Sequence, residues 1–125
     1  MTGEGDLDGR RILVVEDDYY LATDATRALR GAGAQVLGPC STEEDAREEL
    51  AEQRPHAVVL DINLGSGPTL KLAEALKDQE IPFVFVTGYD QDVIPPEFDR
   101  IPRLEKPVPL RQIVGAVARL VAPTA

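Results

Sequence analysis

Acidic side chains end two apolar segments of this sequence. Residues 11–15 run directly into Glu16 and Asp17, and residues 57–60 run directly into Asp61. A short apolar run bounded by turn signals is typical of a strand buried on both faces of a sheet. Ligands of open α/β sheets bind beyond the carboxyl ends of the strands. Asp61 is therefore predicted to be a chemical centre, and the other two acids are its expected partners.

A hydroxyl and an ammonium end two further segments, because Thr87 follows residues 83–86 and Lys106 follows residues 103–105. Several ionised carboxylates in one cleft repel each other and need a cation. Oxygen ligands without His or Cys select a hard ion, and a site that keeps waters suits Mg²⁺. Thr87 and Lys106 are donors for an anion. These groups together describe a site for a phosphoryl group, with Asp61 as the nucleophile and an aspartyl phosphate as the product.

The elements that must position these groups alternate between strand and helix. Strands are predicted at residues 11–15, 34–38, 57–61, 83–87 and 103–106; helices are predicted at about 21–30, 41–53, 69–79 and 110–121, with one helical turn near 97–100. The form Ser41-x-x-Glu44 is that of a capping box. This order predicts an α/β fold with a parallel sheet covered by helices on both faces. The strand-end groups should then converge at one edge of the sheet.

Composition limits the classes of partner. The 125 residues make one domain, and their net charge of −9 disfavours nucleic acid and anionic membranes, although excess acid also simply aids solubility. The single cysteine, Cys40, excludes an internal disulfide and fits a reducing compartment. No apolar run approaches the length of a membrane span. Residues 1–10 are expected to be a disordered leader to a cytoplasmic protein.

The motifs, taken in order, resemble the receiver domain of two-component response regulators from about Arg11 to Val121. Each motif is weak alone, but their succession at strand ends is specific. They are Val14-Val15-Glu16-Asp17, Leu60-Asp61, Val86-Thr87-Gly88 and Glu105-Lys106-Pro107. The resemblance implies a flavodoxin-like, doubly wound five-stranded sheet of order 2-1-3-4-5, with the receiver domain at residues 11–122.

The same resemblance implies roles for single residues. Asp61 would be the phosphoacceptor, and Mg²⁺ would be held by Glu16, Asp17, Asp61 and the backbone carbonyl of Asn63. Thr87 and Lys106 would bond the phosphoryl group, and the Lys106–Pro107 bond would be cis. The expected partner is a sensor histidine kinase or a phosphotransfer protein.

Two stretches narrow the match. Residues 60–64 and 82–89 look like the subgroup named for its Phe-Ala-Thr-Gly-x-Tyr motif (FATGUY), with Val86 in the Ala position. Arg103 stands where most receivers carry Tyr or Phe, and prolines shorten or break the fourth helix. The usual Thr–aromatic switch is therefore not expected, and Tyr89 is the hypothesised gate or reporter of the site.

Plainer interpretations exist for these residues. Asp61 could cap a turn, Glu16 and Asp17 could serve a helix dipole, and Asp18 is expected to cap a helix or to support the site. His56 is expected to be a loop residue rather than a phosphocarrier.

The leading function is a stand-alone receiver, a monomer or weak homodimer, that signals through a downstream protein or drains phosphoryl groups from a shared kinase. It would not be an enzyme acting on external substrates. An aspartyl-nucleophile phosphatase is disfavoured because it needs a second acid where Asn63 stands. A receiver-like binding module that is never phosphorylated is the third possibility.

Overall fold

The computed structural model describes residues 5–65, 67–88 and 94–122. Five parallel strands form one sheet in the order β2-β1-β3-β4-β5. The strands are β1 (Arg11–Val15), β2 (Gln35–Cys40), β3 (Ala57–Asp61), β4 (Phe83–Thr87) and β5 (Arg103–Glu105). The parallel sheet confirms the prediction from the sequence pattern, and its strand order is the flavodoxin-like one that the resemblance implied.

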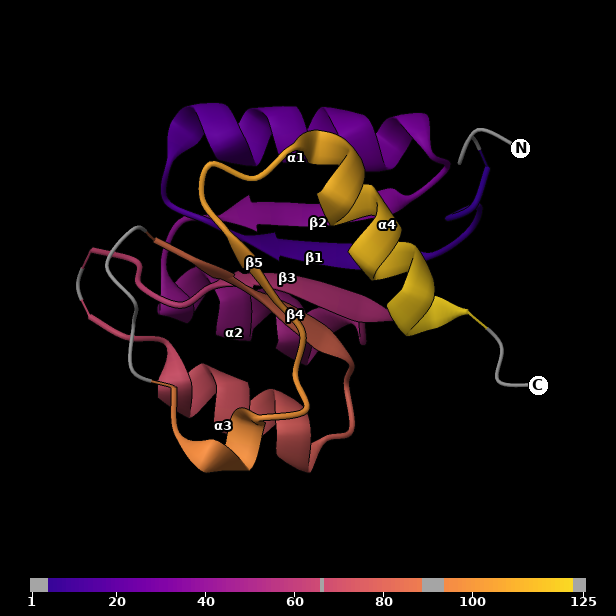
Figure 1. Ribbon diagram of the computed structural model, residues 1–125. Coiled ribbons are helices and arrows are strands. Elements are labelled where there is room, and N and C mark those ends of the chain that lie inside the picture. The colour runs from indigo at the N-terminus through magenta and orange to yellow at the C-terminus, as the bar shows by residue number, and fades with distance from the viewer. Residues whose placement is uncertain (1–4, 66, 89–93, 123–125) are drawn as a thin grey trace.

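Four helices cover the sheet in two layers (Figure 1). They are α1 (Tyr19–Gly31), α2 (Glu43–Glu52), α3 (Leu70–Asp78) and α4 (Leu110–Val121). Helices α1 and α4 lie on one face, and α2 and α3 lie on the other. No helix within the described residues is long and apolar enough to cross a lipid bilayer.

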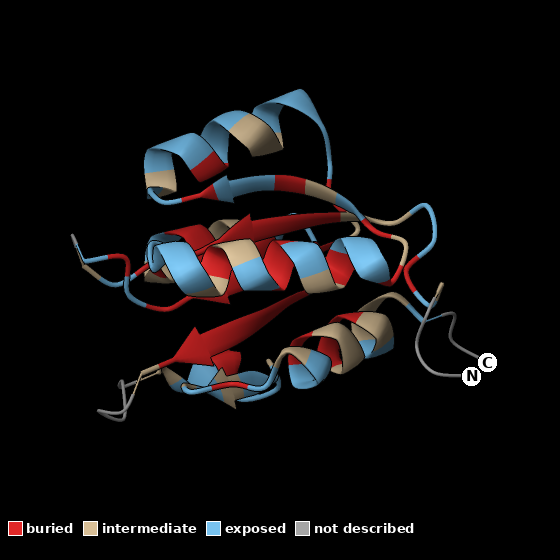
Figure 2. Cartoon of the chain, turned by 90° about the horizontal axis from the view of Figure 1, so that it is seen from above, coloured by how far each residue is buried: buried red, intermediate tan, exposed pale blue. Residues whose placement is uncertain are grey.

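The alternation of side chains along each strand separates the core into two halves. In β1, Leu13 and Val15 pack on the side of α2 and α3, whereas Ile12 and Val14 pack on the side of α1 and α4. All five residues of β3 and of β4 are buried, because helices cover both of their faces. Figure 2 shows the buried residues along the strands and the exposed ones on the outer faces of the helices.

The start of α2 differs by one residue from the predicted capping box. Thr42, not Ser41, is the N-cap, and its hydroxyl accepts a hydrogen bond from the N–H of Asp45 at 3.1 Å. Asp45 therefore stands at the third helical position, where the capping-box prediction placed Glu44.

Strand β2 continues past its predicted end at Gly38 to Cys40. The Gly38–Pro39 bond is cis, and the φ of Gly38 is +84°. A Cβ at Gly38 would lie 2.7 Å from the backbone nitrogen of Cys40, so only glycine fits there. Pro39 lies where the pairing of β2 with β1 is irregular, because the register shifts between Leu13 and Val15, and β2 is an edge strand.

The predicted fourth helical segment is a single turn of 3₁₀ helix, η1 (Pro96–Phe98), within the described residues 94–102. This confirms the single helical turn predicted near residues 97–100, which begins one residue earlier. The ring of Phe98 packs edge-on against Phe85 and Phe83, with centroids 5.7 Å and 6.4 Å away. The Nζ of Lys77 in α3 donates to the Glu97 carbonyl at 2.7 Å. The turn is thus anchored to β4 and α3.

The prediction of a disordered leader over residues 1–10 is wrong for residues 5–10; residues 1–4 lie outside the described part of the chain. Leu7 has no exposed surface and packs with the α1 and α4 side of the core. Its N–H donates to the Ala32 carbonyl at 2.9 Å, and the N–H of Gly9 donates to the Gly33 carbonyl at 3.3 Å. One leucine among Gly and Asp gave no periodic signal for this packing.

Candidate functional site

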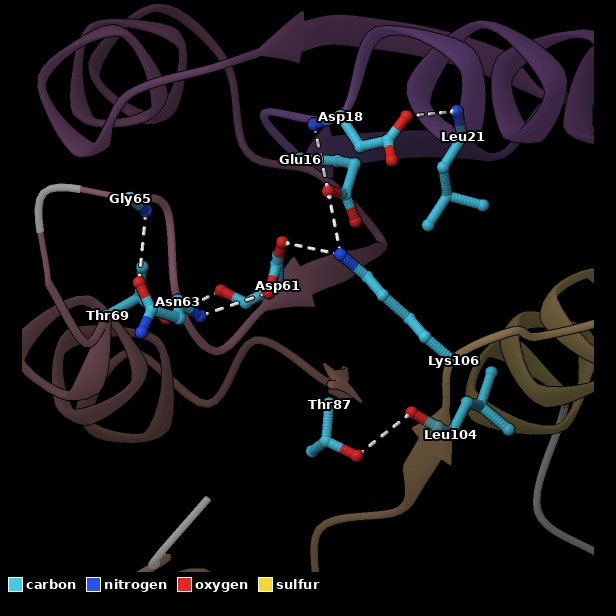
Figure 3. Close-up of polar contacts among 10 residues, drawn as sticks. All are labelled: Glu16, Asp18, Leu21, Asp61, Asn63, Gly65, Thr69, Thr87, Leu104 and Lys106. Atoms are coloured by element: carbon cyan, nitrogen blue, oxygen red, sulfur yellow. Dashed lines mark hydrogen bonds and ion pairs between the residues drawn. The ribbon is translucent and has the colours of Figure 1, made fainter. Parts of the chain in front are cut away.

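The carboxyl ends of β1, β3, β4 and β5 bring the predicted groups to one edge of the sheet (Figure 3). Asp61 is the last residue of β3 and is only 3% exposed. Glu16 follows β1 and is 4% exposed, whereas Asp17 is exposed. The position of Glu16 is fixed by its own N–H, which donates to the Cys40 carbonyl of β2 at 2.9 Å.

Three carboxylates meet at this edge. Oxygens of Glu16, Asp17 and Asp61 all lie within 4.8 Å of one another, and they form the one group of metal-ligating type found among the described residues. The loop after β3 comes close to them, since a Cβ at Gly65 would lie 3.2 Å from Oδ2 of Asp17. The positive φ of Gly65, +77°, adds to the requirement for glycine.

Lys106 lies between the two buried carboxylates. Its Nζ is 3.1 Å from Oδ2 of Asp61 and 3.1 Å from Oε2 of Glu16. Its N–H donates to the Thr87 carbonyl at 2.8 Å, which continues the β4–β5 ladder by one residue, and the Lys106–Pro107 bond is cis, as predicted. Burial alone would lower the pKa of the Lys106 ammonium, but the contacts with Asp61 and Glu16 outweigh it and raise that pKa.

The ionised form of Glu16 is destabilised by its surroundings. Burial, followed by its interaction with Asp61, raises its pKa from 4.5 to about 7. The N–H of Asp18 and the Lys106 ammonium act in the opposite direction, and the former donates to Oε2 of Glu16 at 3.1 Å. A raised acid pKa means that the carboxylate form lacks sufficient compensation from the protein alone. Bound positive charge would supply it.

The donor set fits Mg²⁺. All the side-chain ligands are carboxylates, no imidazole or thiolate is among them, and one of the three acids is exposed to water. Such a site suits a hard cation that keeps part of its hydration. Glu16, Asp17 and Asp61 would hold the ion, and the Asn63 carbonyl stays a predicted further ligand. The N–H of Asn63 donates to Oδ1 of Asp61 at 3.0 Å, so this loop is tied to the carboxylate.

Thr87 ends β4 at the same edge, as predicted, and is 9% exposed. Its hydroxyl donates to the Leu104 carbonyl of β5 at 3.4 Å, a long hydrogen bond. In Figure 3 this hydroxyl points towards β5 and away from Asp61.

The remaining predicted residues are outside this cluster. Arg103 is exposed on β5, and Tyr89 lies outside the described residues. His56 lies at the opposite, amino end of the sheet, where its Nδ1 accepts the N–H of Arg11 at 2.9 Å. Asp18 is the N-cap of α1, and its side chain accepts the N–H of Leu21 at 3.0 Å. The capping role expected for Asp18 is confirmed.

Thr69 was missed by sequence reasoning. It is 1% exposed, and its hydroxyl donates to the backbone carbonyl of Asp61 at 2.8 Å. The sequence placed it only at the start of a helix. Its signal was weak, because a threonine before a helix ordinarily indicates a cap.

Comparison with known proteins identifies relatives of the chain. The family described as "Response regulator receiver domain" matches residues 12–118. The sensory transduction protein LytT of Bacillus cereus is 36% identical over 114 residues, which are 87% of this chain and 46% of LytT. The phyllosphere-induced regulator PhyR of Methylorubrum extorquens is 32% identical over 83 residues, covering 64% of this chain and 31% of PhyR. The chain thus spans half or less of the length of these curated relatives.

Solved structures give the same result. SdrG from Sphingomonas melonis superposes with a TM-score of 0.78 at 31% identity, covering 94% of this chain and 98% of that one. The receiver domain of PhyR from Erythrobacter litoralis superposes with a TM-score of 0.75 at 22% identity, covering 94% of this chain and 97% of that one. At 22% identity, the similarity to this PhyR domain shows a shared fold.

Proposed function

Because this chain belongs to the family of response regulator receiver domains, we propose that Asp61 accepts a phosphoryl group from a phosphohistidine in a Mg²⁺-dependent reaction. The donor is a sensor histidine kinase or a phosphotransfer protein. The observation that carries the proposal is the meeting of Asp61 with Lys106 Nζ at 3.1 Å beside two further acids.

The proposed reaction is an in-line displacement at phosphorus. An oxygen of the Asp61 carboxylate forms the new O–P bond while the P–N bond to the donor histidine breaks, and the bonding electron pair stays on the imidazole nitrogen. Lys106 neutralises charge on the transferred group. Glu16, Asp17, Asp61 and the Asn63 carbonyl would hold Mg²⁺, which would supply the remaining positive charge.

Thr87 and Lys106 bind the phosphoryl group once it is on Asp61. Lys106 exchanges its contact with the Asp61 carboxylate for one with a phosphoryl oxygen. The Thr87 hydroxyl leaves the Leu104 carbonyl and donates to the phosphoryl group. The hydrogen bond from the Thr87 hydroxyl to the Leu104 carbonyl is long, 3.4 Å, and therefore weak, which supports its replacement at a small cost in free energy.

We propose that the phosphorylated chain either signals by contact with a downstream protein or removes phosphoryl groups from a shared kinase. A cytoplasmic location is part of this proposal. The match to SdrG over 98% of that chain supports a receiver unit of this size. The motif at residues 82–89 supports membership of the FATGUY subgroup. In that subgroup, Tyr89 would replace the aromatic side chain absent at Arg103.

Phosphotransfer from autophosphorylated histidine kinases tests the proposal. The wild-type chain should take the label from at least one kinase, and Asp61→Asn should take none. Asp78→Asn, which removes an exposed acid of α3, should be labelled like wild type. The proposal fails if no kinase labels the wild type or if Asp61→Asn is labelled equally well. Turnover of a small phosphomonoester would instead favour a phosphatase.

A further inference from the structure

Thr69 stands at the N-cap of α3 but does not use its side chain as a cap. Asp18 and Thr42, the N-caps of α1 and α2, each accept an N–H of their own helix. The hydroxyl of Thr69 instead donates to the backbone carbonyl of Asp61 at 2.8 Å, and both partners are buried. This contact joins the N-cap residue of a helix to the proposed phosphoacceptor.

The backbone of Thr69 strengthens the same connection. Its N–H donates to the Ile62 carbonyl at 2.8 Å, and its carbonyl accepts the N–H of Ala73 in α3 at 2.9 Å. An antiparallel bridge between Asn63 and Pro68 closes the loop between them. Thr69 therefore holds two successive carbonyls at the end of β3, and it is itself held by α3.

The aim of the Asp61 carboxylate depends on this backbone. Its Oδ1 accepts the N–H of Asn63 at 3.0 Å, and its Oδ2 faces Lys106 at 3.1 Å. Figure 3 shows Thr69 and Asn63 on one side of Asp61 and Lys106 on the other. A rotation of the peptide that joins Asp61 to Ile62 would move the carboxylate relative to Lys106 and would also displace Asn63.

We propose that Thr69 is a positioning residue: its hydroxyl fixes the backbone of Asp61 and so aims the Asp61 carboxylate at Lys106 and at the metal. The inference rests on the proposed function of Asp61. Without the hydroxyl, the Asp61 carbonyl would be buried without its partner, and the local backbone would rotate to reach another donor.

The test compares variants that differ by a hydroxyl. Mg²⁺ affinity is measured by NMR chemical-shift titration. The rate of phosphoryl uptake is measured with a small phosphodonor, and stability is measured by urea unfolding. Thr69→Val should weaken Mg²⁺ binding about 10-fold, the scale of a lost contact that orients a metal ligand, and should slow phosphoryl uptake. Thr69→Ser should restore both to within about 2-fold of wild type, since it keeps the donor.

Thr42→Val is the matched control for stability. It removes a threonine hydroxyl that caps α2, on an exposed helix start outside the site. It should lower stability and leave Mg²⁺ affinity unchanged. If Thr69→Val does not fold, Thr69→Ala and Thr69→Ser form the pair, because they differ only by the hydroxyl.

Two results would overturn the inference: a valine or alanine variant that binds Mg²⁺ like wild type, or a serine variant that binds no better than the valine or alanine variant. Failure of the proposed function is distinguishable from both. In that case the wild type itself would accept no phosphoryl group, while the Mg²⁺ titration would still report on Thr69.

Discussion

The Nζ of Lys106 lies 3.1 Å from Oδ2 of Asp61. This contact links the end of the outer strand β5 to the end of the central strand β3. The same ammonium lies 3.1 Å from Oε2 of Glu16. One cation is therefore shared by two buried carboxylates, and Asp17 adds a third negative charge nearby. The site has more negative charge than its own lysine neutralises, and a divalent cation would correct this imbalance.

Glu16 should make stability depend on pH. Its pKa in the folded chain is about 7, above the ordinary 4.5. Between these values the folded chain keeps a proton that the unfolded chain has lost, so stability should fall as the pH rises from about 4.5 to about 7 and then level off. Urea unfolding across this range should show a decline of about 3 kcal/mol, the size of a shift from 4.5 to about 7. Glu16→Gln should remove this part of the profile.

Mg²⁺ should change the same profile, because the ion binds the deprotonated carboxylate. The increase in melting temperature caused by excess Mg²⁺ should be larger at about pH 8 than at about pH 6. An equal increase at both pH values would contradict the involvement of Glu16 in metal binding.

Leu7→Ala should destabilise the chain by about 3 kcal/mol, because Leu7 is fully buried against the α1 and α4 side of the core. Equilibrium urea unfolding measures the loss. Asp6→Ala, at the exposed neighbouring residue, should stay within about 0.5 kcal/mol of wild type. Equal stability of Leu7→Ala and wild type would restore the prediction of a disordered leader.

Thr26→Val should stabilise the chain by about 1 kcal/mol. The Thr26 hydroxyl is the one buried side-chain oxygen without a hydrogen-bond partner in the described part of the chain. Valine keeps the shape of the side chain and removes the polar group. Thermal unfolding should show a higher melting temperature, whereas Thr26→Ser, which keeps the hydroxyl and loses the methyl group, should lower it. A lower melting temperature for Thr26→Val would show that the hydroxyl has a partner in solution.

His56 should contribute stability only while it is neutral. Its Nδ1 accepts the N–H of Arg11, and burial together with Arg11 and Arg10 lowers its pKa below 6.5. Its contribution is therefore complete above the unfolded-state pKa of about 6.5 and is lost as the pH falls towards the lower folded-state pKa. His56→Leu should cost about 1 kcal/mol at about pH 8, and this difference should shrink below about pH 6. A constant difference in unfolding free energy would contradict the prediction.

The sheet and the site edge were predictable because their signals are local and strong. The apolar runs of β1, β3 and β4 are continuous, and each ends in a polar residue with few structural uses there. Parallel topology then converts these strand ends into neighbours. Lys106 and Glu16 are 90 positions apart in sequence, and topology alone brought them together.

The features that could not be predicted from the sequence depend on tertiary contacts. The burial of Leu7 requires the side of the core that α1 and α4 cover, which no local pattern reveals. The hydroxyl of Thr69 has two possible partners, its own helix and the end of β3, and only the folded loop selects between them. The cap of α2 moved by one residue because Ser41 and Thr42 are both good caps.

The most direct measurement is the intact mass of the chain after incubation with acetyl phosphate and Mg²⁺. The expected result is a gain of about 80 Da, the mass of one phosphoryl group, which requires Mg²⁺ and is absent in Asp61→Asn. The same gain in Asp61→Asn, or no gain in the wild type, would contradict the assignment of Asp61 as the phosphoacceptor.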